Sequence, residues 1–369
     1  MKKIIVVILL ALVILSIYFI TNFNNSKLVS ENKTEDPITK MLESMSLEEK
    51  VGQMFMVRCP KDDAIKKVAE YHLGGYILFS RDFENKTKEE VISNITSYQD
   101  AAKIPLLIGV DEEGGTVNRI SKYKEFRDEP FASAQSLYKE GGLSNIYDDT
   151  SKKAQFLKSL GINTNFAPVA DVSTNPNDYI YKRSFGADAY STSEYVETVV
   201  SAMHQNKIAS VLKHFPGYGN NSDTHSGISI DNRPYETFKT SDFLPFIAGI
   251  NKGADIVLVS HNIVTAMDAK SPASLSKKVH DILRNDLNFS GVIITDDLYM
   301  DAIKDYTGNE TAAVKAVLAG NDLLCTTDFE TQIPAVIAAV KEGTIKEEQI
   351  DSSVYRILKL KENLDLLEF

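Results

Sequence analysis

The chemically richest stretch of the sequence is the loop K-H-F-P-G-Y-G-N-N-S-D-T-H-S-G at residues 213–227, which places a lysine, two histidines and an aspartate between apolar runs. A second acidic pair, Asp296 and Asp297, follows another apolar run. These side chains suit acid–base or nucleophilic catalysis. A metal hydrolase is an alternative, but its candidate ligands lack the compact spacing of a metal motif; they are His214, Asp223 and His225.

The elements that must position these residues are eight short apolar runs that alternate with amphipathic helical stretches. Continuous apolar runs indicate strands covered on both faces, and the strand–helix alternation predicts a parallel sheet. We therefore expect an α/β fold, a (β/α)8 TIM-type barrel, with an open doubly wound sheet as the alternative. The predicted strands are residues 55–58, 75–80, 105–111, 163–168, 209–214, 255–260, 291–296 and 321–325.

Nearly every predicted strand ends in polar or charged residues. Because the carboxyl ends of the strands of a barrel meet at one mouth, residues far apart in the sequence become neighbours around one pocket. Polar residues also follow strands simply because loops are polar, which explains single cases better than the paired ones. The strand-end residues are Arg58, Arg81, Asp111, Asp171, Lys213, His214, His261 and Asp296.

The composition narrows the kinds of partner. The chain of 369 residues is 43% hydrophobic and has a formal net charge of −11, which argues against nucleic acid or an anionic membrane surface as the main partner. Small neutral or basic ligands fit this charge. The cysteines, Cys59 and Cys325, are too few for a disulfide framework, so we expect two buried thiols.

The N-terminus predicts export from the cytoplasm. Two lysines precede an uncharged apolar run over residues 4–20 that is long enough to cross a bilayer, and no A-x-A cleavage pattern follows. We therefore expect a single-pass membrane anchor over residues 1–20, a tether over residues 21–36 and an extracytoplasmic globular domain over residues 37–369. A cleaved signal peptide, which would give a secreted protein, is the alternative.

Several motifs, taken together and in order, resemble glycoside hydrolase family 3 over residues 37–369, in particular its single-domain β-N-acetylglucosaminidase type. The resemblance implies retaining hydrolysis of a terminal β-linked N-acetylglucosamine by double displacement, with no cofactor and no metal. The motifs are S-L-E-E-K-V-G-Q-M at 46–54, G-V-D-E-E-G-G-T-V-N-R at 109–119, R-S-F-G at 183–186, K-H-F-P-G at 213–217, D-T-H at 223–225 and T-D-D-L-Y-M at 295–300.

The resemblance also implies roles for individual residues. Asp296 is the nucleophile; Asp297 competes for this role, but neighbours in extended backbone face opposite ways, so we expect only one to reach the sugar. The proton donor is His225, oriented by Asp223 two residues earlier on the same side of the loop. The residues expected to contact the terminal sugar are Asp111, Arg119, Arg183, Lys213 and His214.

The loop departs from the family pattern in one respect, and other functions stay open. Tyr218 and Asn220 replace a histidine and an aspartate, in a loop one residue shorter, which leaves Asp223 and His225 in place. A β-glucosidase or a phosphorylase of the same family, and a membrane-tethered sugar-binding protein without turnover, are the alternatives. The expected substrate is an amino-sugar oligosaccharide, either a cell-wall muropeptide or a chitin fragment.

Overall fold

The structure, a computed structural model, describes residues 36–219, 221, 228–307 and 311–369. The chain separates into two units, Met1–Ser44 and Met45–Phe369, and the first contributes the described helix α2 (Pro37–Glu43). The predicted anchor over residues 1–20 and nearly all of the predicted tether over residues 21–36 lie outside the described residues. Within the described residues, every helix is too short or too polar to span a bilayer.

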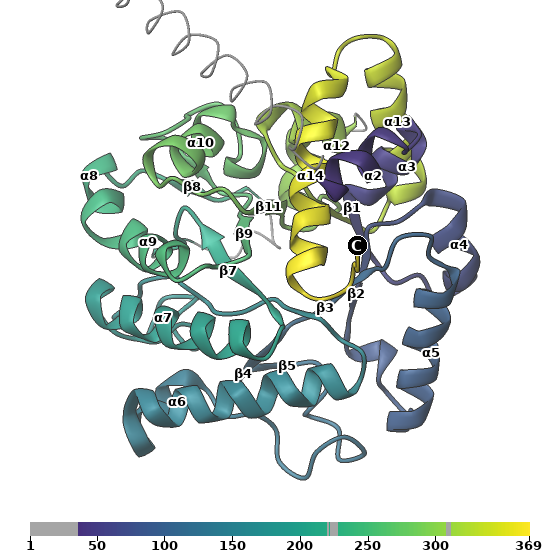
Figure 1. The fold of residues 1–369 in the computed structure, drawn as a ribbon. Helices are drawn as coiled ribbons and strands as arrows, with labels where there is room; N and C mark the ends of the chain where they lie inside the picture. The colour runs from purple at the N-terminus through teal and green to yellow at the C-terminus, as the bar shows by residue number, and fades with distance from the viewer. Residues whose placement is uncertain (1–35, 220, 222–227, 308–310) are drawn as a thin grey trace, which may run out of the picture. The chain divides into compact units, whose positions relative to one another are not determined.

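The second unit is an α/β fold built on one parallel sheet of eight strands (Figure 1). The sheet order is β11-β9-β7-β6-β3-β2-β1-β12, which follows the chain from strand to strand. The ends of this order meet through an isolated bridge between Ile294 and Leu323, so the sheet is a nearly closed barrel. The strands are β1 (Phe55–Arg58), β2 (Gly75–Leu78), β3 (Leu107–Val110), β6 (Thr164–Asn165), β7 (Ala209–Phe215), β9 (Ile256–Val259), β11 (Val292–Thr295) and β12 (Leu324–Thr326).

This order confirms the predicted barrel and shows that the doubly wound alternative is wrong, because such a sheet reverses its strand order part-way. Each of the eight predicted strands overlaps an observed one. Several observed strands are shorter than predicted, and for β2 the cause is a hydrogen bond within the following turn. Strand β2 stops at Leu78 because Asp82 accepts a hydrogen bond from the Phe79 N–H (2.7 Å) and closes a short 3-10 turn over Ser80–Asp82.

Several helices between the strands begin at a side-chain cap, among them α3 (Leu47–Gln53), α5 (Lys88–Ala101), α6 (Ala134–Ser159) and α7 (Ala189–Gln205). A capping box opens α3: Ser46 Oγ accepts from the Glu49 N–H (3.2 Å), and Glu49 accepts from the Ser46 N–H (2.9 Å). The other longer α-helices of the unit are α4 (Ala64–Tyr71), α9 (Phe243–Asn251), α11 (Asp301–Thr307), α12 (Ala312–Ala319), α13 (Phe329–Lys341) and α14 (Glu347–Asn363).

Short strands lie at the carboxyl ends of the barrel strands, and the sequence pattern does not predict them. A hairpin, β4 (Glu112–Gly114) and β5 (Val117–Asn118), directly follows β3. A parallel pair, β8 (Ile230–Asp231) and β10 (Ile263–Val264), joins the loops after β7 and β9. Two or three residues are too few to show hydrophobic periodicity, which is why these elements were missed.

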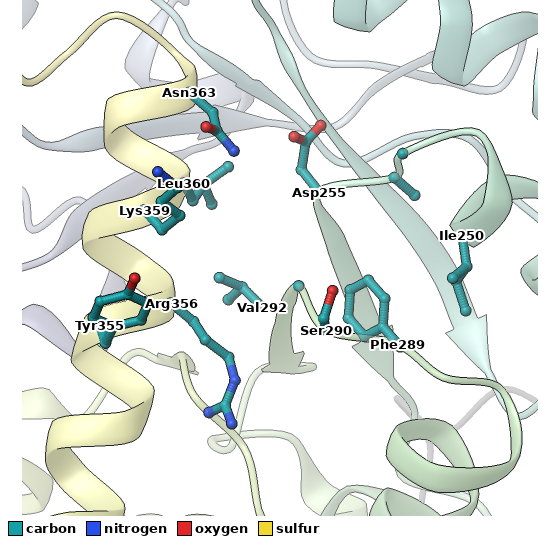
Figure 2. Close-up of a pocket in the computed structure, with 13 residues that line it drawn as sticks. Ile250, Asp255, Phe289, Ser290, Val292, Tyr355, Arg356, Lys359, Leu360 and Asn363 are labelled. Atoms are coloured by element: carbon teal, nitrogen blue, oxygen red, sulfur yellow. The ribbon is translucent and has the colours of Figure 1, made fainter. Parts of the chain in front are cut away.

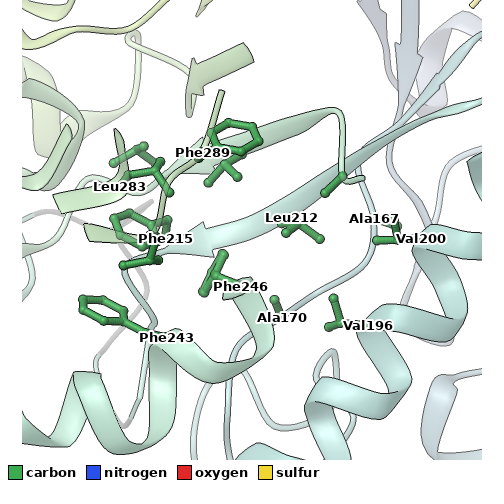
Figure 3. Close-up of a cluster of buried hydrophobic side chains, with 14 of the residues drawn as sticks. Ala167, Ala170, Val196, Val200, Leu212, Phe215, Phe243, Phe246, Leu283 and Phe289 are labelled. Carbon is green, nitrogen blue, oxygen red and sulfur yellow. The ribbon is translucent and has the colours of Figure 1, made fainter. Parts of the chain in front are cut away.

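The core fills the space between strand and helix layers. On one side of the barrel, Leu212 and Phe215 of β7 pack against Val196 of α7 and Phe246 of α9, and all four side chains are fully buried (Figure 3). Burying such side chains contributes about 1.5–3 kcal/mol each. Cys59 and Cys325 are buried free thiols, as predicted.

Candidate active site

A cavity of about 440 Å³ opens where the strands end, and it gathers residues from strands far apart in the sequence. The six described residues of the predicted site all line it; they are Asp111, Arg119, Arg183, Lys213, His214 and Asp296. The other two predicted site residues, Asp223 and His225, lie outside the described residues. The barrel therefore brings the described part of the predicted site together, as expected from convergent strand ends.

Lys213 is the buried cation of the cavity, with only 2% of its side chain exposed. Its ammonium group donates to Asp111 Oδ1 (2.8 Å) and forms an ion pair with Glu113 Oε1 (2.6 Å). His214, the next residue, also lines the cavity. The two acids hold the lysine in one position beside the space for a ligand.

Glu113 is a second buried acid that was not among the predicted site residues. Arg183 donates to both of its oxygens, through Nε (3.1 Å) and Nη2 (2.7 Å). Burial by itself raises the pKa of Glu113, but the positive charges of Lys213 and Arg183 outweigh burial and lower this pKa to about 2. Glu113 is therefore ionised and fixes both cations. The run D-E-E after a predicted strand was the signal that could have identified it.

His214 is oriented by another buried acid that the sequence analysis recorded only as a strand end. Asp171 Oδ2 lies 2.7 Å from His214 Nδ1, and Arg183 Nη2 lies 3.3 Å from His214 Nε2. Because a guanidinium only donates, Nε2 accepts this contact and Nδ1 carries the proton that it donates to Asp171. Tyr218, which replaces the family's histidine, packs its ring edge-on to His214 and donates its N–H to Asp171 Oδ1 (2.7 Å).

Asp296 and Asp297 both line the cavity, and that only one of them reaches the sugar stays a prediction. The alternation argument fails because β11 ends at Thr295 and the next residues turn. The two carboxylates nevertheless differ. Asp297 accepts from the Tyr299 N–H (2.9 Å) and the Thr327 hydroxyl (2.9 Å), and burial raises its pKa. Asp296 accepts from the Asp297 N–H (2.8 Å).

The hairpin after β3 positions the cavity's other arginine. The fully buried carboxylate of Glu112 accepts from the N–H groups of Arg119 (2.8 Å) and Ile120 (2.9 Å) and from the Ser121 hydroxyl. These bonds turn the chain so that Arg119 Nη2 lies 3.5 Å from Asp111 Oδ2. Glu112 therefore has a structural role, while Asp111 and Arg119 face the ligand space.

The described start of the loop that follows β7 is held by a buried ion-pair cluster. Arg233 pairs with Asp231 (2.8 Å) and Asp242 (2.9 Å) and donates to the Gly217 carbonyl (3.2 Å). Burial raises the pKa of Asp242 to about 6, although Arg233 opposes this shift. Gly217 has a φ of +123°, and a Cβ there would lie 2.4 Å from Asp242 Oδ1, so this position requires glycine.

A second cavity, of about 270 Å³, lies at the opposite, amino-terminal ends of the strands, between α14 and the residues that precede β9 and β11 (Figure 2). Its acid, Asp255, accepts from the Ser210 N–H (2.9 Å) and hydroxyl (3.1 Å). Its arginine, Arg356, donates to Asp322 (2.8 Å). In the described residues of the whole chain, we found no cluster of three or more acids, histidines or cysteines placed to hold a metal ion.

Comparisons with known proteins agree with this geometry. The family described as Glycosyl hydrolase family 3 N terminal domain matches residues 46–360. The Beta-hexosaminidase LpqI of Mycobacterium tuberculosis is 29% identical over 330 residues, which are 86% of this chain and 83% of that protein. A Beta-hexosaminidase of Xylella fastidiosa is 31% identical over 293 residues, covering 77% of this chain and 83% of its own.

A solved structure shares both sequence and fold. A glycoside hydrolase family 3 beta-N-acetylglucosaminidase from Paenibacillus sp. str. FPU-7 has a TM-score of 0.81 and 32% identity, over 88% of this chain and 63% of that one. This chain thus spans less than two thirds of the Paenibacillus protein. The match confirms the resemblance drawn from the motifs: the chain belongs to glycosyl hydrolase family 3 and is a glycoside hydrolase.

Proposed function

We propose that this protein is a retaining exo-glycosidase that removes terminal β-linked N-acetylglucosamine. The observation that carries the proposal is the convergence of Asp111, Lys213 and Asp296, from three separate strand ends, on one cavity. The relatives named as beta-hexosaminidases support the amino-sugar part of the proposal.

The ion-pair network around the cavity suits sugar recognition. A carboxylate has about four lone-pair sites, so Asp111 can pair with Lys213 and still accept hydrogen bonds from two sugar hydroxyls. Arg183 and Lys213 are held by Glu113, and His214 is held by Asp171. Because these side chains are fixed before the substrate arrives, little ordering is needed when it binds.

The proposed reaction has two steps. Asp296 attacks the anomeric carbon while the bond to the leaving oxygen breaks, and His225 donates its proton to that oxygen. Water then attacks the glycosyl–Asp296 ester, His225 takes a proton from the water, and Asp296 leaves as a carboxylate. Asp223 orients His225 and stabilises its protonated form in both steps. The bonds that hold the Asp297 carboxylate favour Asp296 as the nucleophile.

The first test compares release of nitrophenol from the N-acetylglucosaminide and from the glucoside, with and without inorganic phosphate. We expect the N-acetylglucosaminide to be preferred and free N-acetylglucosamine to be the product. Faster cleavage of the glucoside would favour a β-glucosidase, and a sugar phosphate product would favour a phosphorylase. Tight sugar binding with no turnover of either substrate would favour a sugar-binding protein.

We also propose that the enzyme acts outside the cytoplasm, anchored by residues 1–20, on cell-wall muropeptides or chitin fragments. The uncharged run over residues 4–20 behind two lysines motivates this placement. Full-length protein is expected in the membrane fraction, and a version that starts at Asn32 is expected to be soluble and equally active. A mature N-terminus created by cleavage, with the enzyme in the medium, would replace the anchor with a secreted form.

A further inference from the structure

Arg58, at the end of β1, lines the same cavity as Asp111 and Asp296, and the proposed reaction gives it no task. Its guanidinium carbon lies 4.7 Å from the centroid of the Phe79 ring, and that of Arg119 lies 5.7 Å from the same centroid. Cation–π contact with one ring positions both cations. Arg58 and Arg119 therefore form a pair of positive groups on one wall of the cavity.

Arg58 lacks the counter-charge that the other cavity cations have. Lys213 pairs with Asp111 and Glu113, Arg183 pairs with Glu113, and Arg119 pairs with Asp111. Among the described residues, no carboxylate forms an ion pair with Arg58. A cation that is partly removed from water without a counter-charge favours an anionic partner.

The buried donors of the two arginines give a second, independent indication. The Nε–H groups of Arg58 and Arg119 are both buried, and each lacks a hydrogen-bond acceptor in the described part of the chain. Buried donors are rarely left unsatisfied, because the lost interaction with water is not replaced. These Nε–H groups lie within the cavity wall, so a small shift of either side chain is needed for a ligand oxygen in the cavity to accept from them. An anionic oxygen forms the stronger bond with a guanidinium and offsets its charge.

We propose that Arg58 and Arg119 form an anion subsite that accepts a sulfate or phosphate ester carried by the terminal sugar itself. The proposal rests on the proposed function, since it concerns the sugar that the enzyme releases. The terminal sugar is favoured over the leaving group because Arg119 also pairs with Asp111, the residue proposed to bind that sugar's hydroxyls. Arg58 is thus a specificity-determining residue.

The test compares kcat/KM for a neutral aryl N-acetyl-β-glucosaminide with that for the same glycoside sulfated on O3, O4 or O6 in turn. We expect the wild type to prefer one sulfated substrate. Arg58→Gln should lower the sulfated-to-neutral ratio about tenfold or more, and Arg58→Lys should keep part of it. High salt should also lower the ratio in the wild type.

Arg81→Gln is the matched control, because it removes the same charge from the end of the neighbouring strand, where Arg81 lines a separate cavity. We expect it to leave the ratio unchanged. A ratio near one for all sulfated substrates, or an equal fall in Arg81→Gln, would overturn the proposal. A preference confined to an acidic phenol leaving group would overturn the placement on the terminal sugar.

Two control measurements separate effects on folding and on turnover from effects on sugar binding. Melting temperatures show whether each variant is folded. Calorimetric titration with free N-acetylglucosamine and its sulfates compares the wild type and Arg58→Gln without requiring turnover. No hydrolysis of the neutral glycoside, with sulfated sugar still bound through Arg58, would contradict the proposed function and leave the subsite standing. Equal affinity of both proteins for the sulfated sugar would overturn the subsite.

Discussion

The two ends of the barrel use the same residue types in different ways. At the base, the buried carboxylate of Asp322 accepts from Arg284, from Arg356 (2.8 Å), from the Ser353 hydroxyl (3.0 Å) and from the Ile293 N–H (2.9 Å). Both oxygens of Asp322 therefore accept hydrogen bonds from other parts of the protein. At the mouth, the described cations leave buried donors on Arg58 and Arg119 without an acceptor.

We infer from this difference that the charged residues at the base stabilise the fold, whereas those at the mouth bind a ligand. The base network links the segment before β12 to α14, to β11 and to the segment before β11, so its loss should be seen in folding stability. The mouth network surrounds a larger cavity, about 440 Å³ against about 270 Å³ at the base. Loss of a mouth residue should be seen mainly in catalysis. The predictions below test this division from the largest expected effect to the smallest.

Removal of Asp296, the proposed nucleophile at the mouth, should have the largest effect. Asp296→Ala is expected to lower kcat by about 10⁴-fold, with a nearly unchanged melting temperature. In the wild type, a fluorinated sugar should label Asp296. Peptide mass mapping locates the label. Label on Asp297 would assign the nucleophile differently. No label, together with tight binding of oxazoline inhibitors, would indicate catalysis assisted by the substrate's own acetamido group.

Substitution of His225, the proposed proton donor, should produce a selective loss. His225→Ala is expected to slow substrates with poor leaving groups by about 10²- to 10⁴-fold and activated aryl glycosides much less, because the latter need little protonation. Asp223→Asn should reproduce much of this defect, since an amide stabilises the imidazolium less well. Steady-state kinetics over a series of phenols measures it. Equal losses across the series would mean that His225 does not transfer the proton.

At the base, the expected effect is on stability. Asp322→Asn leaves Arg284 and Arg356 without their carboxylate, and breaking such buried pairs costs about 3–5 kcal/mol. Urea unfolding should show a loss of about this size, while kcat/KM of the folded fraction stays within about twofold of the wild type. A large fall in kcat/KM with unchanged stability would show that the two ends are not separable in this way.

For each pH unit, Lys361 should change stability by the smallest amount of these effects, and the change depends on pH. It is fully buried, its ammonium nitrogen lies 2.6 Å from Gln53 Oε1, and burial lowers its pKa to about 7. Between this pKa and the usual value of about 10.4, the unfolded chain is protonated at this lysine and the folded chain is not. Stability should therefore rise with pH in that window, by on the order of 1 kcal/mol per pH unit.

Lys361→Met removes this titration. The difference in unfolding free energy between the variant and the wild type should be largest near pH 7, with the variant more stable, and should shrink toward pH 10. Urea unfolding at several pH values measures it. A difference that does not change with pH would mean that Lys361 keeps its charge in the folded protein.

The sequence predicted the barrel because its signals are local. Eight apolar runs, each bounded by turn residues, identify strands without knowledge of their neighbours, and a capping box such as that at Ser46 needs only residues three positions apart. The hairpin β4–β5 and the pair β8–β10 are too short to leave such a signal. The roles of Glu113 and Asp171 in orienting other side chains were not predicted. In a sequence, a charged residue after a strand looks the same whether it orients another side chain or faces water.

The pairing of charges depended on tertiary structure. The amino-acid order alone was enough to bring Asp111, Lys213 and Asp296 to one mouth, because parallel strands in a barrel end on the same side. It did not show that Lys213 pairs with Asp111, 102 residues away, or that Arg183 pairs with Glu113, 70 residues away. Those contacts, and the absence of a described carboxylate partner for Arg58, arise only when the sheet closes. Ion pairing depends on distance in space and on burial, neither of which hydrophobic periodicity encodes.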